Sequence, residues 1–368
     1  MVGAVCFSRN GVLHMRVIDR HIAAQVIINT LLVLLVLTAL ASLITFVGEL
    51  GHVGQGKYSL MEAGLYTLLY IPSQAYSMFV VAVLLGAMLG LGDLASHNEL
   101  MVMRTAGLSV ARLGISAMGG GLVLLVLCVV LGEFIAPSAQ RYAEYRRSQL
   151  LYNQINLLGN GGIWAKDGDK FLNVKQMTER NSAQGIYIYR VDSEHHLLSI
   201  AEAASAVFRN GTWSLKDLHE TKLSPAGATT QNLPSLGWHT YLGPELLSLF
   251  VVDSDSLSAH GLYRYIEYLR SNGIDANRYI TAFWARIAQP LSMLVMLVLA
   301  LPFVFGPLHS ATTGQRLVTG MLIGIGFLVF NSIFTQSGMV FGLNPVLTAW
   351  LPTLLLAIIS GIAVSRIR

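Results

Sequence analysis

Long apolar stretches alternate with polar segments along the chain. Six of them are long enough to cross the hydrocarbon of a bilayer as a helix, which takes about 20 apolar residues. They are residues 23–47, 60–91, 115–137, 283–305, 317–336 and 345–364. The first carries no charged residue, and the second is long enough to tilt, with Pro72 predicting a kink. The pattern predicts six transmembrane helices.

The polar block between the third and fourth stretches, residues 138–260, has a different texture. Short alternating runs such as "GIYIYRVD" and "TWSLKDLHET" are separated by turn-prone clusters such as "AKDGDK". Alternation with a period of two predicts half-buried strands, and Asn210-Gly211 predicts a hairpin turn. The predicted fold class is therefore an α-helical membrane protein with an inserted all-β domain, a sandwich or jelly roll.

Composition agrees with a membrane protein. Hydrophobic residues make up 54% of the chain and charged residues 12%, whereas roughly a quarter of the residues of a soluble domain are charged. The basic residues are dispersed and the net charge is only +4, which argues against nucleic acid as a partner. The two cysteines, Cys6 and Cys128, have neither disulfide-framework nor metal-ligand spacing, so we predict no metal site.

The short loops predict the orientation, because Lys and Arg favour the cytoplasmic side. One set of segments contains Arg16, Arg20, Arg104, Arg112, Arg316, Arg366 and Arg368, and all of these fall on one side if six spans alternate. The opposite short loops contain only Lys57. Both termini are therefore predicted to be cytoplasmic, and the β domain to lie on the outer side.

The same features divide the chain into segments. Residues 1–14 are interpreted as an N-terminal extension, because Met15 opens "MRVIDRHIAAQ", which is typical of a protein start. Residues 15–137 contain spans one to three with a short cytoplasmic helix at about 94–106. Residues 138–260 form the β domain, and residues 261–368 form a linker helix followed by spans four to six.

The stretch "GHVGQGKYS", residues 51–59, is close to a phosphate-binding loop. However, Tyr58 replaces the hydroxyl residue that binds Mg²⁺, and the stretch follows a predicted transmembrane helix rather than a strand. We interpret it as a glycine-rich turn between two spans. Any ATP must then be bound by another chain. A lipid-modifying enzyme is disfavoured because no span contains a catalytic cluster.

The segment between spans two and three predicts a short helix. Ser96 and Glu99 have the spacing of a capping box, and the helix is expected to end near Gly107. Such a helix either rests in lipid headgroups or fits a groove of a partner. Glu99 accordingly either caps the helix or also pairs with a basic group of the partner.

Several polar residues lie within the spans or just beyond their outer ends, and most of them have two interpretations. Arg146 and Arg147 belong either to a solvated helix extension or to an anion-recognition edge. Asn331, within the fifth span, makes either a helix-packing hydrogen bond or a ligand contact. Glu133 is costly in lipid and is expected to face protein or a cavity.

Several motifs together resemble a known family. They are "GQGKYS", "LLGAMLGLGDLASHNELMVMRTAGLS", "GEFIAPSAQ", "GIWAKDG", "AHGLYRYIEYLRSNGIDANRY" and "QPLSMLVMLVLALPFVFGPL". From Met15 onward the chain resembles the lipopolysaccharide-export permeases of the LptF/LptG type. "GIWAKDG" with "VGQGKYS" makes it more similar to the G-type than to the F-type.

The resemblance implies a non-catalytic subunit of an ABC transporter in the inner membrane of a Gram-negative cell. The transporter would extract lipopolysaccharide and pass it to a periplasmic bridge. The implied partners are an F-type permease, two copies of a cytoplasmic ATPase that binds ATP and Mg²⁺, and a single-span C-type protein. No cofactor is implied on this chain. The alternative is a membrane scaffold that tethers periplasmic proteins without transport.

The resemblance also implies roles for individual residues. The short helix becomes a coupling helix with Glu99, Leu100, Met103 and Arg104 toward the ATPase. The family's lipid-contacting positions imply Thr45, His52, Lys57, Arg146, Arg147 and Asn331 as lipid-binding residues, with walls of the lipid cavity from spans one and five. Basic residues usual late in span one are replaced here by Thr45, Gly51 and His52, and Glu144 stands where an arginine is usual.

Overall fold

A computed structural model describes residues 9–152, 163–179, 181–192, 194, 196–209, 212–224, 227–239, 257–305 and 313–366. Within these residues, six helical segments are long and apolar enough to cross a membrane. Five of them are single helices: α1 (Arg9–Leu50), α2 (Leu60–Ser96), α8 (Asn277–Phe305), α9 (Thr313–Val340) and α10 (Pro345–Ser365). The sixth is one continuous segment made of α4 (Val110–Val130), the π-helical turn η1 (Leu131–Ile135) and α5 (Ala136–Tyr152). The prediction of six transmembrane helices is confirmed.

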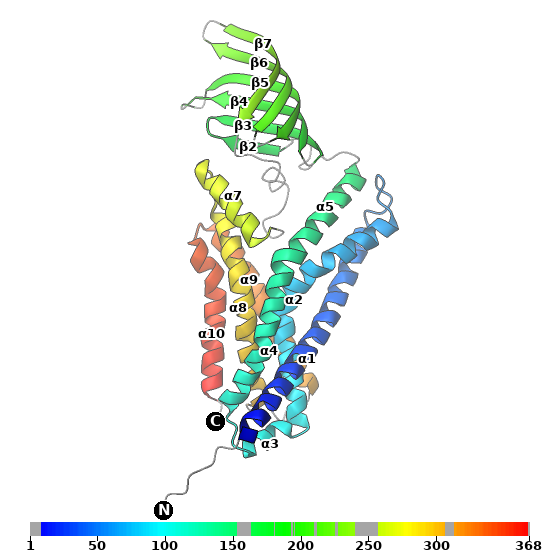
Figure 1. Ribbon diagram of the computed structural model, residues 1–368, viewed down its shortest axis with the longest axis vertical. Coiled ribbons are helices and arrows are strands. Elements are labelled where there is room, and N and C mark those ends of the chain that lie inside the picture. Colours follow the sequence, from blue (N-terminus) through cyan, green and yellow to red (C-terminus); the bar gives the residue numbers. More distant parts are fainter. Residues whose placement is uncertain are drawn as a thin grey trace, which may run out of the picture. The chain divides into compact units, whose positions relative to one another are not determined.

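The remaining elements are two short helices and a sheet (Figure 1). The helices are α3 (Glu99–Thr105) and α7 (Ala259–Ser271). The strands are β2 (Ile163–Asp167), β3 (Lys170–Glu179), β4 (Ser182–Val191), β5 (Leu197–Arg209), β6 (Thr212–Ser224) and β7 (Gly227–His239).

The chain divides into two compact units, which are described separately. The first unit comprises Met1–Thr45, Tyr70–Ser138 and Ile280–Arg368, and the second comprises Phe46–Leu69 and Ala139–Tyr279. The first unit thus contains most of the transmembrane helices. The second contains the sheet, α5, α7 and the hairpin that joins α1 to α2.

The first unit packs around α2, which is the most buried of the spans, whereas α1 and α9 are the least buried. Phe79, Leu84 and Met88 of α2 are almost inaccessible and pack in one core with Met293 and Met296 of α8. The outer faces of α1 and α9 expose rows of Leu, Val and Ile. Such continuous apolar surface is untenable in water and is expected of helices that face lipid or another chain.

One close approach between α1 and α2 depends on glycine. A Cβ atom added to Gly86 would overlap the Cα atom of Thr30, so the two backbones pack directly against each other. Small residues allow this close packing of transmembrane helices, where dispersion replaces the hydrophobic effect as the attraction.

Polar groups within the spans find partners inside the protein. The nearly buried Gln74 accepts a hydrogen bond from Ser42 and donates one to the Thr45 hydroxyl oxygen at 2.6 Å. Glu133 lies in the π-helical turn η1, 3.8 Å from Arg286, which also donates to the Gly132 carbonyl at 2.8 Å. The prediction that Glu133 faces protein is confirmed, as expected where an unpaired charge would be costly.

The second unit contains one antiparallel sheet in which the strands follow in chain order from β2 to β7. Along β4, β5 and β6, buried positions alternate with exposed ones, so one face is the apolar core. Leu172, Ile186, Ala203 and Leu215 contribute to that face. The inserted β domain is therefore confirmed.

The connections within the sheet explain its topology. Arg209 pairs with Thr212, so β5 and β6 form the expected hairpin, while Asn210-Gly211 themselves lie outside the described residues. Each described strand pairs antiparallel with the next strand of the chain, which is the order of a meander. A jelly roll has two packed sheets. The described strands form one sheet, so the jelly-roll detail is not seen in the described part of the chain.

Helix α7 docks on the edge of this sheet at β2. The Tyr268 hydroxyl donates to the Lys166 carbonyl at 2.8 Å and accepts from its N–H at 2.9 Å, and Asn272 accepts from the Gly168 N–H. These contacts satisfy backbone groups at the end of an edge strand. Burial raises the pKa of Tyr268, so its hydroxyl stays protonated. The polar block that begins at residue 138 starts as helix, because α5 continues to Tyr152. The described strands begin at Ile163.

Gly86→Ala is expected to destabilise the protein, because the new methyl group meets backbone rather than a flexible side chain. Overpacking of this kind costs about 1–3 kcal/mol. The measurement is the thermal midpoint of the purified protein in detergent. Gly64→Ala is the matched control on α2, since a Cβ atom there meets nothing within 4 Å. Equal midpoints for the two variants would contradict the backbone contact.

Candidate functional site

Two groups of polar residues are candidates for a functional site. One lies near the start of α1 and just after the end of α2, in the first unit, and the other lies near the end of α1 and the start of α2, in the second unit. The loop-helix cluster comprises Asp19, His21, Glu99, Arg112 and Ser116 in the first unit. The arginine cluster comprises Glu49, Tyr58, Glu62, Arg146 and Arg147 in the second unit.

The start of α3 differs from the predicted capping box. Ser96 is the last residue of α2, and its hydroxyl donates back to the Asp93 carbonyl at 2.8 Å. The N-cap is Asn98, in a left-handed conformation with φ 61° and no side-chain capping bond. The capping-box prediction is wrong because α2 runs further than its polar end indicates. The prediction that α3 ends near Gly107 is confirmed, since its last residue is Thr105.

Glu99 is held by α1 instead. Its Oε2 atom lies 3.2 Å from His21 Nε2, and both side chains are 45% exposed. The contact uses one carboxylate oxygen, and nearly half of the Glu99 side chain remains exposed. Glu99 can therefore be oriented by its own chain and still accept a cation from a partner.

The side chains of α3 divide into two faces. Leu100 is 3% exposed and belongs to the core of the first unit, and Met103 packs partly against the same core. Arg104 is exposed, as are the apolar side chains of Met101 and Val102. Leu100 and Met103 therefore fix α3 to the core of the first unit and do not belong to its exposed face. The exposed face consists of Glu99, Met101, Val102 and Arg104.

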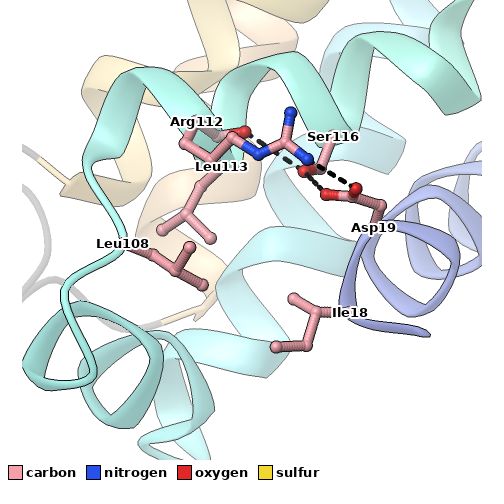
Figure 2. A pocket seen from close by; sticks show the side chains of 6 residues that line it. All are labelled: Ile18, Asp19, Leu108, Arg112, Leu113 and Ser116. Carbon is pink, nitrogen blue, oxygen red and sulfur yellow. Dashed lines mark hydrogen bonds and ion pairs between the residues drawn. The ribbon is translucent and has the colours of Figure 1, made fainter. Parts of the chain in front are cut away.

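A second link ties α1 to the start of α4. Figure 2 shows Asp19 of α1 pointing toward Arg112 and Ser116 of α4. Arg112 Nη2 donates to Asp19 at 2.7 Å, and the Ser116 hydroxyl donates to the other carboxylate oxygen. The sequence could not reveal this network, because Asp19 lies 93 residues from Arg112. The adjoining hollow, with Ile18 and Leu108 on its walls, has a cavity volume of about 10 Å³, far less than the roughly 300 Å³ of an ordinary ligand pocket.

In the arginine cluster, Arg147 makes the more buried ion pair. Its Nε atom donates to Glu49 Oε2 at 2.9 Å, and the Tyr58 hydroxyl donates to the same oxygen at 2.9 Å. Glu49 is only 10% exposed in its side chain, and Tyr58 is almost fully buried. The guanidinium group also lies over the ring of Tyr66, 5.3 Å from its centroid. Burial, reinforced by the Glu49 carboxylate, raises the pKa of Tyr58, so the hydroxyl remains a donor.

Arg146 makes a more accessible pair. Its Nε and Nη2 atoms donate to the two oxygens of Glu62, each at 2.7 Å, in the bidentate geometry that suits a carboxylate. The Arg146 side chain is 41% exposed and that of Glu62 is 19% exposed. Its Nη1 atom lies 3.4 Å from the Tyr142 hydroxyl. Both arginines of the predicted anion edge are therefore paired within the chain.

The glycine-rich turn packs against the end of α5. The Lys57 N–H donates to the Leu150 carbonyl at 2.8 Å. Gly56 has φ +55°, and a Cβ atom there would lie 2.5 Å from the same carbonyl oxygen. The turn follows helix α1, which agrees with a connection between two spans and not with a phosphate-binding loop. Its side chains differ in exposure, because Lys57 is exposed and His52 half-buried.

The other two predicted lipid-binding residues lie in the first unit. Thr45 is half-buried, and its hydroxyl oxygen accepts from Gln74, so it contributes to packing between α1 and α2. Asn331 is half-buried on α9. The structure thus brings Arg146 and Arg147 together with Tyr58, and the backbone of Lys57 lies against the same helix α5. A lipid-binding role for the six residues stays a prediction.

Metal chemistry finds no support in the described residues, which contain no group of three His, Cys, Asp or Glu side chains able to hold an ion.

The profile of the family described as "Lipopolysaccharide export system permease LptF/LptG" matches residues 20–366. The chain belongs to this family. Its relatives include the lipopolysaccharide export system permease protein LptG of Escherichia coli (strain K12), 38% identical over 92% of this chain and 94% of the relative. The same protein of Haemophilus influenzae is 35% identical over 95% of this chain and 99% of the relative. The resemblance inferred from the motifs is confirmed, including its G-type character.

Arg147→Ala is expected to destabilise this chain, because it leaves the nearly buried Glu49 carboxylate without its cation. The expected loss is about 1–3 kcal/mol, measured as a lower thermal midpoint of the purified protein. Arg209→Ala, which removes an exposed arginine at the end of β5 in the same unit, is the control and should change stability by less than about 0.5 kcal/mol. A midpoint unchanged by Arg147→Ala would show that the pair does not support the fold.

Proposed function

We propose that this LptF/LptG-family permease is the non-catalytic transmembrane subunit of an ATP-driven exporter. It would extract lipopolysaccharide from the inner membrane and pass it to a periplasmic bridge. ATP and Mg²⁺ would bind to two copies of a cytoplasmic ATPase. An F-type permease would complete the membrane part, with a single-span C-type protein beside it.

The charge pattern supports the orientation that this function needs. The basic residues before α1, between α2 and α4, before α9 and after α10 fall on one side if the six spans alternate. That side is the cytoplasm by the positive-inside rule. The sheet domain then lies in the periplasm, where lipid leaving the membrane would meet it.

The observation that carries the proposal is the anchored helix α3. It lies between two spans, its inner face is fixed by Leu100, and its outer face presents Glu99, Arg104 and two apolar side chains. A short helix of this kind fits a groove of a partner. Because α1 and α4 are tied together beside it through Asp19 and Arg112, a push on α3 would reach two spans at once.

Energy from a partner is needed because lipid extraction is costly. Each buried CH₂ group contributes about 0.8 kcal/mol to anchorage, and a lipid with several acyl chains has many of them. The exposed apolar faces of α1 and α9 offer walls for a cavity shared with a second permease. The apolar face of the sheet would shield the acyl chains from water in the periplasm.

Glu99→Lys is expected to abolish coupling, because it replaces the carboxylate offered to a basic group of the ATPase by a like charge. Transport of lipopolysaccharide by the purified complex should fall more than about tenfold, which is a loss of about 1.4 kcal/mol or more. Glu194→Lys is the control with the same charge change, at a side chain that is 79% exposed in the sheet domain. Full transport by the Glu99→Lys complex would refute the coupling role of α3.

A reporter inserted at Gly227, at the start of β7, tests the topology. We expect alkaline phosphatase to be active there, because it folds only outside the cytoplasm. Green fluorescent protein fused after Arg368 should fluoresce, because the C-terminus is cytoplasmic. The reverse pair of signals would invert the topology and remove the basis for export.

A further inference from the structure

The two adjacent arginines of α5 differ in how firmly they are held. Arg147 shares the Glu49 carboxylate with the buried Tyr58 hydroxyl and rests on the ring of Tyr66. Its carboxylate partner is 10% exposed. Breaking this pair would leave the nearly buried Glu49 carboxylate without its cation, which is costly. Arg147 is therefore committed to joining α5 to the α1–α2 hairpin.

Arg146 is held by one carboxylate only. Nε and Nη2 face Glu62, while Nη1 points to the hydroxyl of Tyr142, whose side chain is exposed. With 41% of the side chain exposed, the guanidinium group can be reached from outside without unfolding the helix. Because the guanidinium group keeps contact with water beside this pair, an anion of higher charge can compete with the carboxylate for it.

We propose that Glu62 is an internal competitor for the anion site at Arg146, and that it lowers the affinity of that site for a phosphorylated lipid headgroup so that the lipid is released. This inference rests on the proposed export of lipopolysaccharide and on the lipid-binding role that the family resemblance implies for Arg146, and it assigns Glu62 a role in releasing the lipid.

The exchange is chemically balanced, because one bidentate acceptor replaces another. A phosphate monoester carries a charge of about −1.5 to −2 and three acceptor oxygens, and therefore pairs with the guanidinium group more strongly than a carboxylate does. Glu62 remains nearby after it is displaced, and its negative charge opposes the phosphate. The site consequently binds phosphate when lipid arrives and returns to the Glu62 pair when lipid leaves.

A release role is useful because the chain must not retain its cargo. A site with Arg146 alone would hold the headgroup tightly and slow each cycle. With Glu62 present, the free site is already satisfied by an internal pair, so lipid release leaves no unpaired guanidinium group. Glu62 is a positioning residue in this account, since it acts on lipid through Arg146.

The test uses the complete complex in nanodiscs that contain lipopolysaccharide, with a photo-crosslinking residue at Met61. That side chain is 85% exposed and adjacent to Glu62. Glu62→Gln is expected to raise the yield of lipopolysaccharide adducts about threefold and to lower the transport turnover by a similar factor. Glu267→Gln is the control, because it removes the same charge from an exposed glutamate of α7. It should change neither quantity.

The outcomes separate this inference from the proposed function. If Glu62→Gln leaves the adduct yield the same or lowers it, while Arg146→Gln lowers it, then Glu62 has only a structural role. That result would overturn this inference and leave the proposed function intact. Adducts unaffected by Arg146→Gln would overturn the lipid role of Arg146 itself. Adducts that rise only in nanodiscs of phosphatidylglycerol would exclude lipopolysaccharide as the ligand.

Loss of stability is distinguished by a second variant. Glu62→Asp keeps the charge and withdraws the carboxylate, so it should raise adduct yield less than Glu62→Gln and leave the thermal midpoint close to that of the parent. If Glu62→Gln does not assemble, the same two readouts in Glu62→Asp decide the matter. An increase in adducts with lower turnover supports the competitor, and a decrease in both refutes it.

Discussion

Hydrocarbon offers no hydrogen bonds, and the rest of this structure depends on that constraint. Backbone groups in a bilayer must be satisfied within the segment, which selects helices for all six spans. The same constraint applies to side chains. Gln74 bonds to neighbouring hydroxyl groups, and Glu133 lies beside Arg286 where the π-helical turn offers the Gly132 carbonyl. Polar groups within the spans therefore fix which helices pack together, while the apolar faces of α1 and α9 are left for lipid or a second chain.

This constraint also explains how much of the fold could be predicted from the sequence. The six spans follow from length and composition alone, and the β domain follows from its period of two, because both are local properties. The order of strands and the single sheet depend on pairing between segments. The continuation of α5 to Tyr152 agrees with the solvated helix extension considered for Arg146 and Arg147, whereas the ion pairs that this helix makes with distant glutamates could not be inferred from the sequence.

The functional residues show the same limit. Arginines at 146 and 147 stand out because basic residues at the outer end of a span oppose the usual charge bias. Their partners could not be inferred, since Glu62 lies 84 residues from Arg146 and Glu49 lies 98 residues from Arg147. Ser96 gave a misleading signal for a similar reason. Its spacing from Glu99 fits a cap, but α2 continues through Ser96, and the carboxylate turns instead to His21, 78 residues away.

The burial of their ion pairs also explains why the neighbouring residues Arg146 and Arg147 differ in their roles. The energy of a pair depends on how much water its members keep, and that is set by the helices around them rather than by the residue type. Arg147, whose carboxylate is shared with a buried tyrosine, stabilises the junction of α5 with the α1–α2 hairpin. Arg146, the preceding residue, makes the more exposed pair, and this is the pair that we propose exchanges its carboxylate for another anion. In that proposal one pair holds the shape of the chain, while the other takes part in passing a charged lipid.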